Sequence, residues 1–232
     1  MVTQENIGTF FLLSKTPLFL MNIYNDYRYQ IHTHSYMALR KAVGIIGIAL
    51  PFTLMLGVST IFGTDVLQDS ISHYYYTGMR DVFVGSLCAV ALFMFFYAGY
   101  DKTDEWLSNF AGLFALGVAW FPTTEKGAID VIGIIHFGSA SALFIAFAIF
   151  SLFLFTKSKE GVKPTPQKVK RNKIYRICGV VILLSILAMF LYSIFIEDSY
   201  YITRFIFWGE TIALIAFGIS WLVKGEAILA DN

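Results

Sequence analysis

Four ionisable residues lie in or beside apolar segments of this sequence: His73, Asp81, His136 and Glu210. Histidine and carboxylate side chains bind Zn²⁺ in proteins, and the bound water becomes a nucleophile near neutral pH. These residue types predict a zinc site with His73, Asp81, His136 and Glu210 as metal ligands. In that prediction the catalytic groups are Glu210, Asp81 and Ser72, with Glu210 as the general base or the fourth ligand.

The same residues also fit two functions without hydrolysis. An ionisable side chain inside a membrane span is costly, so its presence indicates a role. Glu210 and His136 are candidates to change protonation during transport of an ion or a small solute, through a channel or a proton-coupled transporter. The third possibility is a cavity that binds a lipid or a signal molecule without chemistry.

Each candidate also has a purely structural interpretation. Asp81 is able to stabilise a helix N-terminus, or to pair with Arg80 or Arg204. His136 is able to remain neutral and bond to a carbonyl group, and His73 to bond to a tyrosine. Glu210 has no basic residue at a facing position of its own helix, so it needs a partner from another segment or a proton.

Familiar catalytic and transport motifs are missing from the sequence. It contains no HExxH, no GxSxG, no Walker loop, no TVGYG filter and no row of arginines. A serine–histidine–aspartate set is available in Ser70 or Ser72, His73 and Asp81, but such triads are recognised by their geometry. The motifs therefore leave the three functions open.

Composition excludes an ordinary soluble protein. The chain has 232 residues, of which 57% are hydrophobic and 14% charged, whereas soluble domains have about 25% charged residues. The net charge of +1 gives no basic surface for nucleic acid. We therefore expect membrane lipids as partners, no nucleic acid, and a homo-oligomer as an open possibility.

Hydropathy predicts an all-α bundle of six transmembrane helices, because a span needs about 20 apolar residues. The predicted spans are 42–63, 82–100, 106–122, 131–155, 176–196 and 202–223. They form a transmembrane domain over 42–223, preceded by an N-terminal cytoplasmic or interfacial segment, 1–41, and followed by a cytoplasmic tail, 224–232. The apolar stretch from Phe10 to Met21 is interrupted by Lys15 and Pro17 and is expected to lie at the interface.

Charge asymmetry predicts that both termini are cytoplasmic. The loop 156–175 is strongly basic: it contains Lys157, Lys159, Lys163, Lys168, Lys170, Arg171 and Lys173, against one acid, Glu160. The opposite loops are acidic, with Asp65, Asp69, Glu125, Asp130, Glu197 and Asp198. The second, fourth and sixth spans then begin on the outer side. We therefore expect His73, Asp81, His136 and Glu210 in one outer half of the membrane, around a polar cavity.

Small residues at close spacing recur within the predicted spans, and they let helices approach each other in lipid. These residues are Gly44 with Gly47, Ala111 with Ala115, and Gly138 with Ser139 and Ala142. We expect all of them at helix–helix contacts.

Several motifs resemble those of a widespread group of small, uncharacterised bacterial membrane proteins. The main one is Ser70-Ile-Ser-His-Tyr-Tyr-Tyr-Thr-Gly-Met-Arg-Asp-Val-Phe-Val-Gly85. Others are Gly99-Tyr-Asp101, Ala119-Trp-Phe-Pro-Thr123, Arg171-Asn172 and Ser220-Trp-Leu-Val-Lys-Gly-Glu226. The resemblance covers roughly residues 38–226 and implies a multi-pass protein of the bacterial plasma membrane.

A more distant resemblance is to the ceramidase-like and adiponectin-receptor-like membrane hydrolases. Their metal sites combine a serine, a histidine and an aspartate with two histidines of the last helix. Ser70, His73 and Asp81 supply the first three residue types here, while the last span carries Glu210 and no histidine pair. This resemblance implies a zinc-dependent hydrolase that acts on a lipid or a lipid-linked substrate.

Overall fold

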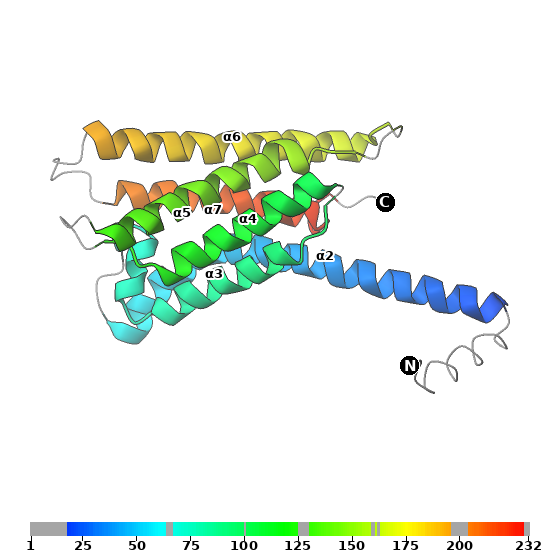
Figure 1. Ribbon diagram of the computed structural model, residues 1–232, viewed down its shortest axis with the longest axis horizontal. Helices are drawn as coiled ribbons and strands as arrows, with labels where there is room; N and C mark the ends of the chain where they lie inside the picture. Colours follow the sequence, from blue (N-terminus) through cyan, green and yellow to red (C-terminus); the bar gives the residue numbers. More distant parts are fainter. Residues whose placement is uncertain are drawn as a thin grey trace, which may run out of the picture. The chain divides into compact units, whose positions relative to one another are not determined.

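The computed structural model is all-α, as predicted (Figure 1). It describes residues 18–63, 67–99, 101–124, 130–158, 161, 163–195 and 204–229, with side chains from Ser35 onward. The α-helices among these residues are α2 (Leu18–Gly57), α3 (Arg80–Phe95), α4 (Lys102–Trp120), α5 (Val131–Ile149), α6 (Pro166–Phe195) and α7 (Phe205–Lys224). Three short helical turns complete them: η1 (Val58–Phe62), η2 (Ser72–Tyr76) and η3 (Phe150–Leu154).

The chain divides into two compact units, 1–39 and 40–232. Helix α2 begins at Leu18, well before the predicted start at residue 42, so part of the predicted N-terminal segment is helical. Only from residue 18 onward is that segment described, and most of the Phe10–Met21 stretch lies outside the described residues. The candidate functional residues all belong to the second unit, whose packing follows.

Four helical segments of the described chain are long and apolar enough to cross a membrane: Ser35–Phe62, Val131–Leu154, Pro166–Phe195 and Phe205–Lys224. Helices α3 and α4 are not among these four segments. Helix α3 has 16 residues, and α4 carries Asp104 and Glu105 in its first turn. The count of six spans and the orientation of the termini therefore stay predictions.

Consecutive helices from α3 to α7 pack against their neighbours in sequence (Figure 1). Carboxylate caps define where two of them begin, because helix N-termini leave backbone N–H groups without helical partners. Asp101 accepts a hydrogen bond from the Asp104 N–H at 3.1 Å, and Asp130 accepts one from the Gly133 N–H at 2.6 Å. The first residues of α4 and α5 are therefore set by capping aspartates, which a hydropathy profile does not detect.

Small residues hold the helices together at most of the predicted positions. A Cβ atom on Gly44 would lie 2.8 Å from the Gly218 carbonyl oxygen, and one on Gly47 would lie 3.0 Å from the Phe217 ring. Ala111 and Ala115 are fully buried. Gly138 is the exception: a Cβ atom there would meet nothing within 4 Å. The prediction is confirmed for the two glycines and two alanines and is wrong for Gly138.

The exterior of the bundle is strongly apolar. Helix α6 exposes large side chains along its length, among them Ile177 at 63% and Phe195 at 77%. Such a surface is unstable in water but is what a helix presents to lipid tails. Together with the four long apolar segments, it identifies a helical integral membrane protein.

Candidate functional site

The loop between α2 and α3 lies against the start of α7 and contains the η2 turn. The Phe207 N–H donates to the Asp69 carbonyl oxygen at 3.0 Å, and the Ile71 N–H donates to Glu210 Oε2 at 2.6 Å. Glu210 thus receives a partner from another segment, as the sequence required. That partner is a backbone N–H group, and within the described chain no basic side chain forms an ion pair with Glu210.

His136 is held by the end of the preceding helix. Its Nδ1 lies 2.6 Å from the Phe121 carbonyl oxygen, and the residue is only 4% exposed. A carbonyl oxygen only accepts hydrogen bonds, so Nδ1 carries the proton. This confirms the structural interpretation of His136 as a histidine bonded to a carbonyl. A metal-binding histidine is often oriented in the same way, so the other ring nitrogen decides between the two roles.

His73 bonds to a serine three residues before it. Its Nδ1 lies 2.7 Å from Ser70 Oγ, and its backbone N–H lies 3.3 Å from the same oxygen. His73 is also close enough to His136 to interact with it electrostatically. Ser72, the predicted catalytic serine, is buried, and the histidine contact belongs to Ser70.

Asp81 is exposed in the first turn of α3. Within the described chain, no three histidine, cysteine, aspartate or glutamate side chains come together in a way that could hold a metal ion. The four predicted ligands do share one end of the bundle, which we call the η2 end. The zinc site itself stays a prediction, and this arrangement does not support it.

An apolar cavity lies beside Glu210, between α2, α3, α4, α5 and α7. Its volume is about 600 Å³, including the space at its mouth. Polar groups are few: Glu210, Ser72 and Ser86 line it among aliphatic and aromatic side chains. Of the four predicted ligands only Glu210 lines this cavity, so a polar cavity shared by all four stays a prediction.

Aromatic rings close the cavity toward the opposite end of the bundle. Phe147 and Phe217 both line it, and their rings stack with centroids 3.6 Å apart. The Phe217 ring lies 6.0 Å from Trp221, which in turn lies 5.1 Å from Phe155. This aromatic layer separates Glu210 from the end of α7 at Lys224.

No family model, curated protein or solved structure matches the chain. The two resemblances therefore stay predictions, and the function has to be inferred from the geometry.

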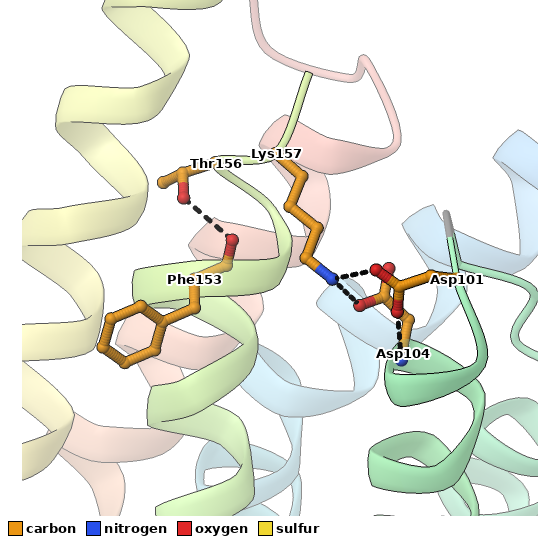
Figure 2. Close-up of polar contacts among 5 residues, drawn as sticks. All are labelled: Asp101, Asp104, Phe153, Thr156 and Lys157. Carbon is orange, nitrogen blue, oxygen red and sulfur yellow. Dashed lines mark hydrogen bonds and ion pairs between the residues drawn. The ribbon is translucent and has the colours of Figure 1, made fainter. Parts of the chain in front are cut away.

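The opposite end of the bundle contains an ion-pair cluster that the sequence analysis missed (Figure 2). Lys157, just after η3, reaches the start of α4, where its Nζ lies 2.8 Å from Asp101 Oδ2 and also bonds Asp104. The Asp104 side chain is fully buried. The hydrogen bond from Lys157 holds the pKa of Asp101 below its usual value. The sequence does contain a signal for this cluster: two aspartates lie three residues apart at the start of one helix, and a lysine lies at the end of a later one.

Proposed function

We propose that this protein is a multi-pass protein of the bacterial plasma membrane that binds an amphiphile without chemical conversion. The apolar part of the ligand occupies the cavity beside Glu210, and its polar group is a hydrogen-bond donor such as a primary amine. One observation carries the proposal: a carboxyl side chain lines an otherwise apolar cavity and has no cationic partner within the described chain.

The chemistry of the cavity favours this ligand class. Ligand sites are concave and mostly apolar, with a few polar groups that set orientation. Glu210 is an acceptor, and a charged or hydrogen-bonded donor on the ligand compensates its burial. Ser72 and Ser86 add two hydroxyl groups along the same wall. An amphiphile with an anionic head is disfavoured, because it would face the carboxyl group.

The other two functions have less support. Hydrolysis through zinc needs at least three converging ligands, and the four candidates do not form such a group. Transport through a single subunit needs a path past the Phe147–Phe217 stack and the Trp221 layer.

Displacement of a fluorescent long-chain alkylamine from detergent-purified protein tests the proposal. Unlabelled competitors share one chain length and differ in the head: amine, alcohol or carboxylate. We expect the amine to bind about tenfold or more tighter than the alcohol, because a charge-assisted hydrogen bond contributes about 1.5–3 kcal/mol. The carboxylate should compete least.

Three variants separate the head contact from the cavity. Glu210→Gln should abolish the preference for the amine and keep alcohol binding, whereas Leu143→Trp should fill the cavity and weaken every ligand. Glu105→Gln removes an exposed carboxylate outside the cavity lining and should change nothing. Equal binding by the wild type and Leu143→Trp would show that the probe only partitions into detergent, and the proposal would fail.

Metal analysis of the same protein tests the rival hypothesis. Near-stoichiometric zinc in the wild type, lost in both His136→Ala and Glu210→Gln, would establish the predicted metal site and replace the binding proposal. Zinc content that does not depend on these residues would leave the rival hypothesis without support.

A further inference from the structure

Helix α6 has one exposed face along its whole length, which we call the outward face. The helix packs against α5 and α7 (Figure 1), and none of its residues lines the cavity beside Glu210. The exposed side chains recur at the helical spacing of three and four residues. The basic ones are Lys170, Lys173 and Arg176, and apolar ones follow at Ile177, Val180, Leu184, Leu187, Leu191 and Ile194. Exposed cations therefore precede a continuous apolar stripe on one face.

The length of this stripe matches the interior of a bilayer. From Ile177 to Ile194 the helix rises about 26 Å at 1.5 Å per residue, close to the hydrocarbon thickness of about 30 Å. When the stripe lies in the hydrocarbon, Lys173 and Arg176 lie about 2–6 Å before it, at the level of the lipid headgroups. Lys170 lies one turn further toward water.

Each of the two cations nearest the stripe has an exposed apolar side chain one turn later. Ile177 comes four residues after Lys173, and Val180 comes four residues after Arg176, so each pair lies on the same side of the helix. A headgroup held by the cations therefore has its acyl chains beside Ile177 and Val180. This combination fits a phospholipid, whereas free phosphate or an acidic soluble protein would use only the cations.

The charge on α6 is entirely positive. The helix contains no aspartate or glutamate, and within the described chain neither Lys173 nor Arg176 forms an ion pair. Arg171 differs, because it is buried and pairs with Glu226. Ammonium and guanidinium groups both match phosphate oxygens, and basic residues beside a span attract anionic headgroups. The charge and the apolar stripe thus point to the same partner.

We propose that the outward face of α6 binds an anionic phospholipid. Lys173 and Arg176 hold the phosphate group, and the acyl chains lie along Ile177, Val180 and Leu184. This site lies outside the cavity beside Glu210, so it does not depend on the amphiphile proposed there.

Native mass spectrometry of the full-length, delipidated protein tests this site. Phosphatidylglycerol and zwitterionic phosphatidylcholine with the same acyl chains are titrated in turn, and inorganic phosphate is added as a competitor in a separate series. The head variant is Lys173→Gln/Arg176→Gln, and the chain variant is Ile177→Ala/Val180→Ala. The control is Lys102→Gln/Lys163→Gln, which removes the same charge as the head variant at exposed positions outside α6.

We expect the wild type to bind phosphatidylglycerol about tenfold tighter than phosphatidylcholine, because both cations attract the anionic headgroup. The head variant should lose this preference, and the control should keep it. The chain variant should bind both lipids more weakly and keep their ratio, since it removes apolar contact and no charge. Thermal unfolding and gel filtration establish that each variant is folded.

Three results would overturn the proposal. An equal loss of preference in the head variant and the control would reduce the effect to overall charge. Inorganic phosphate that abolishes lipid binding would establish a site for free phosphate instead. Unchanged affinities in the chain variant would place the acyl chains elsewhere. Displacement of the alkylamine from the same variants reports on the cavity alone, so the two proposals fail separately.

Discussion

Lys157 is the residue whose removal should destabilise the bundle most directly. Its Nζ bonds Asp101 and the fully buried Asp104, while its own side chain is 30% exposed. Removing one partner of a buried pair leaves an uncompensated charge, which costs about 3–5 kcal/mol when both partners are buried. Solvent at Lys157 reduces this, so we expect Lys157→Met to cost about 1–3 kcal/mol. Thermal unfolding in detergent measures it, with the exposed Lys163→Met as a control that should stay close to the wild type.

The same ion pairs give a pH dependence with a defined sign. The pKa of Asp101 is lowered, first by the Lys157 hydrogen bond. Burial alone would lower the pKa of Lys157, but the bonds from Asp101 and Asp104 outweigh it and raise that pKa. A lowered carboxyl pKa stabilises the folded state above the unfolded value of 3.8, and the effect is lost as the pH falls through the folded pKa. A raised lysine pKa stabilises the folded state below the unfolded value of 10.5. This stabilisation is lost as the pH rises through the folded pKa.

We therefore expect the difference in melting temperature between the wild type and Lys157→Met to be constant near neutral pH. It should shrink in acid and again in strong alkali. Unfolding curves across this range measure it. A difference that persists unchanged when the carboxylates are protonated would show that the methionine acts through packing rather than charge.

At this scale the sequence predicted that Glu210 needs a partner from another segment, and the structure supplies one. It did not predict which groups would serve as partners. The partners themselves, the Ile71 N–H and the Phe121 carbonyl, are backbone groups. Backbone contacts leave no trace in residue types, so side-chain chemistry pointed to a metal site instead.

Helices α2 and α7 approach each other closely at Gly44 and Gly218. A Cβ atom on Gly218 would lie 2.6 Å from the Gly44 carbonyl oxygen and 2.6 Å from Ile48 Cγ1. Alanine in a helix is ordinarily about 1 kcal/mol more favourable than glycine, but here the backbone must move apart. We expect Gly218→Ala to destabilise the protein by about 1–3 kcal/mol, measured as a lower melting temperature.

Gly138 provides the matched control within α5. A Cβ atom at Gly138 has nothing within 4 Å, so Gly138→Ala gains helix propensity without a clash and should leave the melting temperature equal or higher. Equal loss in both variants would contradict the close approach of α2 and α7.

Helix boundaries show why hydropathy predicts some elements better than others. The span predicted at 131–155 matches α5 and η3, which end at Leu154, because an acidic cap and an apolar run coincide there. Helix α6 begins at Pro166, earlier than the predicted 176, since its first turns are basic and an apolar search excludes them. Helix α4 begins at Lys102 and buries Asp104, and the pairing with Lys157 compensates this burial.

At the scale of the whole molecule, one contact bears on the predicted number of spans. Lys157 lies beyond the end of α5, and it bonds Asp101 in the turn before α4. If α5 crosses the membrane, the turn between α3 and α4 lies on the far side from η2, and both of those helices cross as well. The 16 residues of α3 span about 24 Å at 1.5 Å per residue, which a bilayer accommodates by local thinning.

Cysteine labelling distinguishes six spans from four in a Cys88→Ala/Cys178→Ala background. The three labelling variants are Val131→Cys at the start of α5, Lys102→Cys at the start of α4 and Lys163→Cys before α6, all at exposed positions. With six spans and cytoplasmic termini, a membrane-impermeant maleimide should label Val131→Cys in intact bacteria, and the other two only after permeabilisation. With four spans, α3 and α4 would not cross, and Lys102→Cys would label from outside together with Val131→Cys. Labelling of Lys163→Cys but not of Val131→Cys from outside would instead reverse the orientation. Lys102→Cys would then label together with Lys163→Cys if there are six spans, and would stay protected if there are four.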